Sequence, residues 1–300
     1  MEQFTQTIAS GMTNGVVYAL VGVAFALIFN ASDVINFAQG EFVMLGGMSY
    51  VLAYRELGGN VWFSLLCAVV FTATMAAAVY LGIISRMRRT SVLRIVMITL
   101  ALSVLMKGSV LIGAGPDPYS APGLTGNRPL HIAGASLTRQ SLWMLLALVV
   151  LSAALWVMFN RTSVGLRMLA CAVDRRAAAL CGINTHRLVL LSWIISAILA
   201  GVAGALVTPL ANVTYDDGFA YSLYGFAAAA LGGVGRVGGA IAGGLILGLA
   251  NAFAGGYLPE PYSSFHNVVG LIILVLVLVV RPTGLFAGRS EARHTAEVAL

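Results

Sequence analysis

Side chains that could do chemistry are few and scattered in this sequence of 300 residues. The four histidines each lie next to a loop, and the HExxH pattern of zinc proteases is absent. The single lysine, Lys107, is followed by glycine inside an apolar run, so the chain lacks a phosphate-binding Gly-Lys-Ser/Thr loop. The three cysteines have no spacing typical of a zinc site or a disulfide framework. We therefore predict a protein without catalysis, metal or cofactor of its own.

The composition explains why such groups are rare. Apolar residues make up 59% of the chain and charged residues only 9%, with a mean hydropathy of +0.93. Soluble domains carry about 25% charged residues, and the 34 glycines lie mostly inside apolar runs, as in membrane helices. This excludes a cytosolic enzyme, a nucleic-acid binder and a disordered protein. We predict an all-α polytopic integral membrane protein, in which each ionisable residue inside an apolar run is a functional candidate.

A polar break at residues 30–40 separates two apolar runs and is flanked by Asp33 and Glu41. Irregular backbone at membrane depth is tolerated only where protein buries it or where it lines a water-filled cavity. In one interpretation the break borders a translocation path or an inner gate. Its candidate residues are then Asn36, Gln39, Gly40 and Glu41. The alternative is an ordinary cytoplasmic turn in which Asp33 and Glu41 cap helix starts, which we favour for Asp33 alone.

Lys107 is the other ionisable residue inside an apolar run. It lies about one and a half helical turns from the outer end of that run. Its long aliphatic stem can carry the ammonium to the membrane interface. We favour this placement over a role in a transport pathway.

The most specific local pattern lies in the main cytoplasmic loop, residues 160–187. The stretch 174–182 predicts a two-turn helix with Asp174 at its start and Gly182 as the left-handed residue at its end, and Thr185 then caps the next span. So short a helix is marginal unless something packs on it. It is either a knob that docks into a cytoplasmic partner or a solvated connector. The residues concerned are Asp174, Arg175, Arg176, Ala177, Ala178 and Gly182.

Small residues recur at spacings of three and four through residues 232–244. Such spacing lets helices approach closely, and we interpret most of these glycines as helix-packing residues. A gate or hinge is the alternative, with Gly232 and Gly233 as its candidates.

Seven apolar runs are long enough to cross the hydrocarbon core, which takes about 20 residues. They cover residues 8–29, 61–85, 92–113, 141–159, 188–210, 237–256 and 266–280. Two shorter runs, 38–54 and 219–234, fit a tilted span, a re-entrant segment or a buried half-helix. We predict about nine transmembrane or membrane-embedded helices, within a range of seven to ten.

The arginines orient the chain. With the N-terminus outside and the C-terminus cytoplasmic, thirteen of the sixteen arginines fall in cytoplasmic segments, as the positive-inside rule requires. We expect an irregular extracytoplasmic loop at residues 114–140, where prolines and glycines gather. The chain then divides into a transmembrane domain, 1–288, and a polar C-terminal tail, 289–300.

In order along the chain, a series of segments resembles the permease family of branched-chain amino acid ABC importers, specifically the first of its two permease subunits. The segments are GMTNGVVYAL at 11–20, NFAQGE at 36–41, RTSVGLRMLA at 161–170 leading to Asp174 and Ala177, GIN at 182–184, AGVAG at 200–204, LGGVG at 231–235 and RPTGLF at 281–286.

The resemblance implies a bacterial plasma (inner) membrane protein in the lipid bilayer. It implies pairing with a second, homologous permease subunit, two ATP-binding subunits on the cytoplasmic side that bind the ATP, and an extracytoplasmic solute-binding protein. Importer permeases carry a Glu-Ala-Ala…Gly loop for the ATPase contact. Here Asp174 stands near the place of the glutamate, with Ala177, Ala178 and Gly182 as the remainder, which favours the docking interpretation.

The function we expect is a non-catalytic permease subunit of an ATP-driven importer for branched-chain or other hydrophobic amino acids. One alternative is a permease for urea or short amides, which relatives of the family also import. An alternative of another class is an ion-coupled secondary transporter, for which Glu41 is the best embedded carboxylate.

Overall fold

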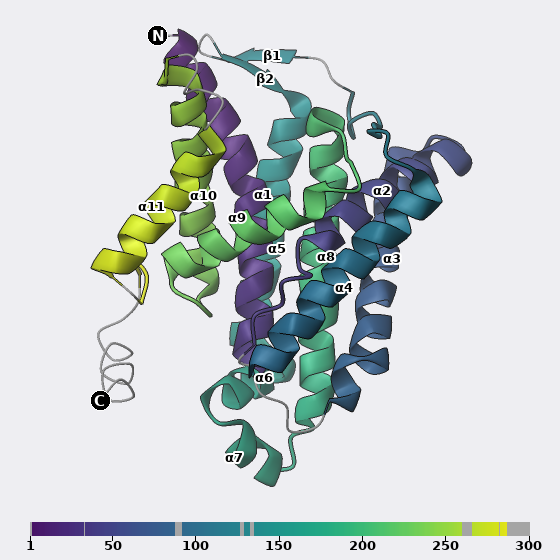
Figure 1. Cartoon of the computed structure of the whole chain (residues 1–300), viewed down its shortest axis with the longest axis vertical. Coiled ribbons are helices and arrows are strands. Elements are labelled where there is room, and N and C mark those ends of the chain that lie inside the picture. Colours follow the sequence, from purple (N-terminus) through teal and green to yellow (C-terminus); the bar gives the residue numbers. More distant parts are fainter. Residues whose placement is uncertain are drawn as a thin grey trace.

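The structure, a computed structural model, describes residues 2–32, 34–87, 92–126, 129–132, 135–259, 266–281 and 283–286. Asp33 and the predicted tail, 289–300, lie outside the described residues. In the described part the chain is helical apart from one short antiparallel hairpin (Figure 1). The elements are α1 (Glu2–Ser32), α2 (Glu41–Glu56), α3 (Val61–Gly82), the 3₁₀ helix η1 (Ile84–Arg86), α4 (Val92–Ala114), β1 (Pro129–Ile132), β2 (Ala135–Thr138), α5 (Arg139–Arg161), α6 (Ser163–Val173), α7 (Arg175–Leu180), α8 (Thr185–Ala211), α9 (Asp217–Gly232), α10 (Val237–Tyr257) and α11 (His266–Val280).

Six helices among the described residues are long and apolar enough to cross a membrane: α1, α3, α4, α5, α8 and α10. They coincide with six of the seven long runs predicted from the sequence. The seventh run forms α11, which has 15 residues. The two short runs form α2 and α9, of 16 residues each. The all-α membrane class is confirmed, and the total of about nine membrane-embedded helices stays a prediction.

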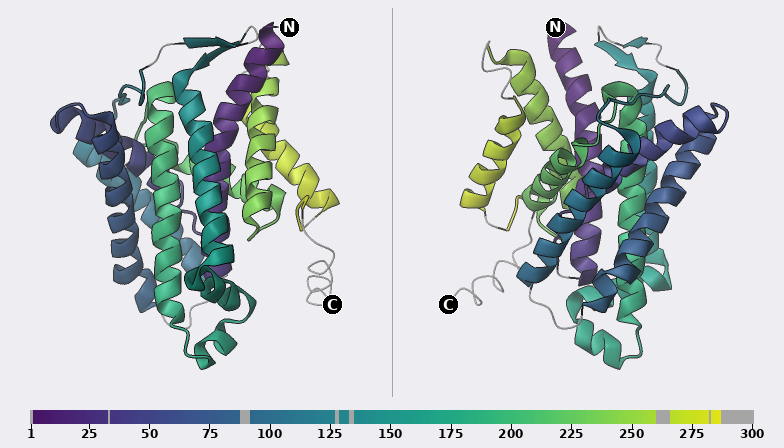
Figure 2. Two further views of the ribbon diagram at one scale, coloured as in Figure 1. Left: turned by 180° about the vertical axis from the view of Figure 1, so that it is seen from behind. Right: turned by 45° about the vertical axis from the view of Figure 1, so that its right-hand side comes forward.

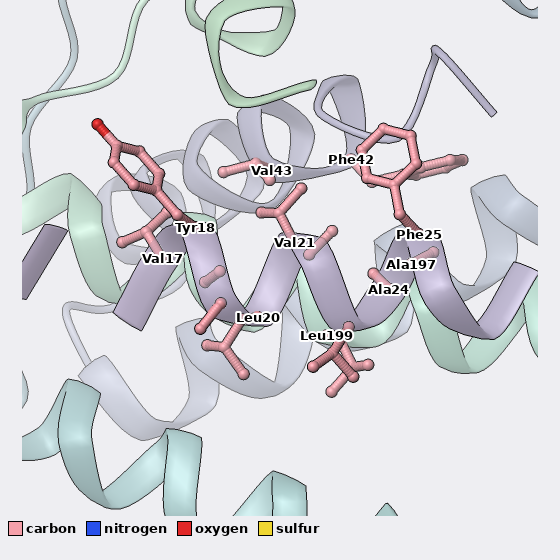
Figure 3. Close-up of a cluster of buried hydrophobic side chains, with 14 of the residues drawn as sticks. Val17, Tyr18, Leu20, Val21, Ala24, Phe25, Phe42, Val43, Ala197 and Leu199 are labelled. Carbon is pink, nitrogen blue, oxygen red and sulfur yellow. The ribbon is translucent and has the colours of Figure 1, made fainter. Parts of the chain in front are cut away.

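The core of the bundle is built around α1 and α8. In their most apolar stretches, 78% of the α1 residues and 67% of the α8 residues are buried, against 28% in α3, 22% in α4 and 17% in α5. Figure 3 shows the α1 side chains Val17, Leu20, Val21 and Phe25 packed among residues of other helices, with Phe42 of α2 beside Phe25. The outer helices therefore present apolar surface that this chain does not cover.

Glycines bring α2 and α8 into backbone contact. A Cβ atom on Gly204 would lie 1.9 Å from the carbonyl oxygen of Val43, and one on Gly46 would lie 2.4 Å from that of Gly201. Only glycine permits so close an approach. The contact fixes α2 to the central helix.

The two ends of the molecule differ. The start of α1 and the hairpin lie at one end, and α6 and α7 lie at the other (Figures 1 and 2). The prediction of an irregular loop at 114–140 was wrong in part, because Pro129 pairs with Thr138 in the β1–β2 hairpin and Tyr119 forms a bridge with Val213. The alternation of apolar residues there is too short to reveal so small a hairpin from the sequence.

The α2–α8 contact makes Gly204 sensitive to a single methyl group. We expect Gly204→Ala to lower the free energy of unfolding by about 1–3 kcal/mol, because the backbones must separate to admit the methyl group. The measurement is thermal unfolding in detergent. Gly113→Ala in α4 is the matched control, since a Cβ there meets open space. Equal unfolding midpoints for the two variants would contradict this account of the packing.

Candidate functional site

Two half-length helices, α2 and α9, begin against each other inside the bundle. The chain turns back after α1, and α2 begins at Glu41. The backbone N–H of Gly40 donates to Ser222 Oγ of α9 at 2.7 Å, and Ser222 Oγ donates to the carbonyl of Phe37 at 2.9 Å. A Cβ on Gly218, in the first turn of α9, would lie 2.1 Å from Glu41 Oε2. In Figure 1, α9 crosses the bundle midway along α1.

The polar residues of the break are buried. Asn36, Gln39 and Glu41 expose at most 1% of their surface. A turn in aqueous surroundings would leave such side chains exposed, so the segment is an internal element of the bundle. Glu41 makes no capping hydrogen bond to the start of α2, whose N-cap is Gly40. Whether the break borders a translocation path stays a prediction.

Gln39 joins the break to α8 through two hydrogen bonds to one residue. Its Nε2 donates to the carbonyl of Ser196 at 3.2 Å, and its Oε1 accepts from Ser196 Oγ at 2.8 Å. The Asn36 side chain accepts from the backbone N–H of Ala38 at 3.1 Å. These bonds satisfy backbone and amide groups that would otherwise be costly inside an apolar bundle.

Glu41 has a less complete set of partners. Its Oε1 accepts from Ser103 Oγ of α4 at 2.6 Å. Its Oε2 is buried and has no hydrogen-bond partner among the described residues. The carboxyl group therefore lies where α2, α4 and α9 meet, with one oxygen against Gly218.

The structure gives Lys107 a partner within the chain, and its predicted position at the membrane interface stays a prediction. Its ammonium forms an ion pair with the carboxylate of Asp216, the residue before α9, and lies 5.5 Å from the centroid of the Tyr215 ring. The partner comes from a segment more than a hundred residues away in the sequence, so the spacing around Lys107 gave no sign of it.

At the other end of the bundle, the helix predicted within residues 174–182 is confirmed as α7, while its cytoplasmic location stays a prediction. Asp174 Oδ1 accepts from the backbone N–H groups of Arg176 at 2.8 Å and Ala177 at 3.0 Å. Both bonds stabilise the ionised carboxylate and therefore lower the pKa of Asp174 below its usual value. The bond from Ala177 has the larger effect. Gly182 has a φ of +79°, as predicted for a helix-ending glycine. The next span is capped by Asn184, which accepts from Arg187, and not by Thr185 as expected.

The structure also adds a helix that the sequence analysis missed. The helix α6 precedes α7 and is capped by Thr162, whose Oγ1 accepts from the N–H of Gly165 at 3.1 Å. The Thr162-Ser163 pair before an apolar stretch was the available signal. Ala178 of α7 packs in a small cluster with Met168, Cys171 and Leu188, which provides the packing that so short a helix needs.

Gly232 and Gly233 lie apart from the break. Gly232 ends α9, fourteen residues after Gly218, which is about 20 Å along the helix. A Cβ on Gly232 would lie 2.0 Å from the carbonyl oxygen of Gly239, so this glycine packs α9 against α10. Gly233 follows with a φ of +98°. The sequence-predicted residues thus fall in three places: the buried break, the α9–α10 turn and α7.

The polar residues that complete the break were not found from the sequence. Ser103, Ser196 and Ser222 contact it from α4, α8 and α9, and Thr99 Oγ1 accepts from the N–H of Phe37 at 3.3 Å. Each is a single hydroxyl in an apolar run, a weak signal when read alone. Among the residues that the structure describes, no group of His, Cys, Asp or Glu could hold a metal ion.

Helices that begin inside an apolar bundle, with a buried polar break where they meet, are a feature of membrane transport proteins. The fold and the site define a polytopic helical membrane protein of this transport class. A family model described as the branched-chain amino acid transport system permease component matches residues 7–278. The chain belongs to this family.

Comparisons with known proteins agree with this assignment. The high-affinity branched-chain amino acid transport system permease protein LivH of Escherichia coli is 31% identical, over 96% of both chains. BraD of Pseudomonas aeruginosa, with the same description, is 28% identical over 96% of this chain and 97% of its own. The ribose import permease protein RbsC of Bacillus subtilis is 30% identical over 61% of this chain and 58% of its own. The solved structure of PsaBC from Streptococcus pneumoniae in complex with Fab has the same fold, with a TM-score of 0.51 at 13% identity over 93% of this chain and 91% of that chain.

The hydrogen bonds of Gln39 make a charge at this position costly. Gln39→Glu replaces the donor to the Ser196 carbonyl with an oxygen, and we expect it to lower the free energy of unfolding by at least about 1–3 kcal/mol. The measurement is the thermal unfolding midpoint at neutral pH. The control is Glu41→Gln, which makes the opposite substitution two residues further along the chain. It keeps an acceptor for Ser103 Oγ, so we expect its unfolding midpoint to be unchanged or raised. A Gln39→Glu variant as stable as Glu41→Gln would show that the Ser196 contact is unimportant.

Proposed function

We propose that this chain is the membrane permease subunit of an ATP-driven importer for branched-chain or other hydrophobic amino acids. The observation that carries the proposal is the family match over residues 7–278, together with 31% identity to LivH over 96% of the chain. The proposed complex contains a second homologous permease, two ATP-binding subunits and an extracytoplasmic solute-binding protein. The permease has no catalytic role, and ATP is bound by the partner subunits.

The proposed topology has about nine membrane-embedded helices, with the N-terminus outside and the C-terminus in the cytoplasm. Two observations support it. The arginine-rich α6–α7 segment and the start of α1 lie at opposite ends of the bundle (Figure 2). The arginines at 86, 161, 167, 175, 176 and 187 all belong to that segment or to the helix ends beside it, as the positive-inside rule requires of a cytoplasmic side.

In this proposal α7 transmits the motion of the ATP-binding subunits. Its outer surface is free for a partner: Arg175, Arg176 and Ala177 are exposed, and Leu180 exposes 90% of its surface. Its inner surface packs through Ala178 against Leu188 of α8. Eight residues further along α8, about 12 Å, Ser196 holds Gln39 in the break. A push on α7 thus reaches the start of α2 through one helix.

The source of energy separates this proposal from ion-coupled transport. In an ion-coupled transporter, replacing the embedded carboxylate Glu41 by glutamine abolishes uptake. In the proposed importer, Glu41→Gln retains part of the uptake, because ATP hydrolysis by other subunits supplies the driving force. The measurement is amino-acid uptake into proteoliposomes that contain the copurified complex, with and without internal ATP. Uphill uptake by the isolated chain alone would refute the proposal, and uptake of urea or short amides in place of amino acids would favour the other permease alternative.

The cap on α7 provides a test of coupling. We expect Asp174→Ala to reduce ATPase stimulation by the loaded solute-binding protein, because two N–H groups of the helix lose their acceptor. Asp174→Asn keeps an acceptor and is the matched control. Because the pKa of Asp174 is lowered in the folded protein, the ionised cap contributes at neutral pH and is lost only as the pH falls through that lowered pKa. Equal ATPase stimulation in the Asp174→Ala and Asp174→Asn variants at neutral pH would exclude this role for the cap.

A further inference from the structure

The ion pair of Lys107 and Asp216 lies within the depth of a membrane span. Lys107 is seven residues before the end of the span Leu93–Ala114, about 10 Å along the helix. It is the only lysine in the sequence. Both side chains remain accessible, with 37% of Lys107 and 59% of Asp216 exposed.

Such a pair does not suit a surface in contact with lipid. Charged groups inside the hydrocarbon region are costly and almost always face protein or a water-filled cavity. Within this chain the pair is only partly covered, so its open side is available to a partner subunit or to a water-filled cavity. If the pair served only to hold α4 against α9, its exposure to water would be a disadvantage, because water weakens the attraction between the two charges.

The surroundings of the pair are apolar on the same face. Val104 and Leu111 lie three residues before and four residues after Lys107, so they share its side of α4. Val104 exposes 71% of its surface and Leu111 38%. Phe219, three residues after Asp216 at the start of α9, exposes 55%. One cation and one anion are thus bordered by aliphatic and aromatic surface.

We propose that Lys107 and Asp216 bind the zwitterionic backbone of a hydrophobic amino acid on its way through the permease. The substrate carboxylate pairs with the Lys107 ammonium and the substrate ammonium with the Asp216 carboxylate, while its side chain lies against Val104, Leu111 and Phe219. When the site is empty, the two protein charges neutralise each other. When it is occupied, each meets the opposite charge of the substrate, so no net charge enters the membrane in either state. This inference rests on the proposed function, because it concerns an amino-acid substrate.

The first test uses variants in the complete complex, with ATP-driven leucine uptake and ATPase stimulation measured together. We expect Lys107→Met and Asp216→Asn each to reduce uptake about tenfold or more, the effect of losing one charge-assisted hydrogen bond, while ATPase stimulation persists. The double variant, which leaves no unpaired charge, should be equally defective in uptake. Asp217→Asn is the matched control: it removes a neighbouring carboxylate, which accepts from the Thr214 N–H, and should leave uptake unchanged.

The double variant separates a substrate site from a structural tie. If the pair only holds α4 to α9, removing both charges together restores uptake toward the wild-type rate. Wild-type uptake by the double variant would therefore overturn the inference and leave the proposed function intact. Absence of ATP-driven amino-acid uptake by the wild-type complex would instead refute the proposed function itself.

A second test needs no variant, because the chain has a single lysine. An amine-reactive acylating reagent modifies Lys107 in the wild-type complex, and mass spectrometry of its peptide gives the rate. We expect excess leucine to slow this modification about twofold or more, because the bound substrate covers the ammonium, which is accessible when the site is empty. The control compound is 4-methylpentanamide, which has the same isobutyl group as leucine but no charge. It should not protect Lys107 from modification. Equal protection by the two compounds, or protection by neither, would count against the site.

Discussion

The structure depends on satisfying backbone groups where two helices begin inside an apolar bundle. Residues 34–36, between α1 and α2, are not helical, and the first N–H groups of a helix lack intrahelical acceptors. The turn before α2 supplies part of what is missing, because the N–H groups of Glu41 and Phe42 donate to the carbonyls of Ala38 and Gln39. Inside a membrane protein, unsatisfied groups of this kind cost several kcal/mol each, by the usual estimate of about 2–7 kcal/mol. Hydroxyl groups of Thr99 in α4 and Ser222 in α9 accept from the N–H groups of Phe37 and Gly40, and the Gln39 amide of the break bonds to Ser196 of α8. These bonds fix how the helices meet.

This constraint explains the positions of the glycines and the central place of α8. Ser196 can reach Gln39 only if α2 lies directly on α8, and Gly46, Gly201 and Gly204 permit that approach. The same helix begins beside α7, where Leu188 packs with Ala178. One helix therefore contacts both α7 and the buried break. A displacement at either end has a direct mechanical route to the other.

The sequence predicted those features that depend on neighbours along the chain. Long apolar runs gave the six long helices, and the Asp174 cap and Gly182 gave α7 because both act within one or two turns. The contacts of the break could not be predicted, since Gln39 and Ser196 are 157 residues apart and a single serine in an apolar run has no pattern. The partner of Lys107 could not be predicted for the same reason, because Asp216 is 109 residues away in the sequence and only the fold brings the two together.

The three least buried of the six long helices, α3, α4 and α5, differ in where they carry charge. In α3 no residue between Val61 and Gly82 is charged, and in α5 the charged residues are Arg139 and Arg161 at its two ends. Their open faces suit lipid or an apolar partner surface. Among these three helices, α4 alone carries a charge within its length away from the ends, and Lys107 finds its counter-ion at the start of α9. The side where α4 meets α9 therefore differs from the open faces of α3 and α5, because it is the one where a charge needs a polar partner.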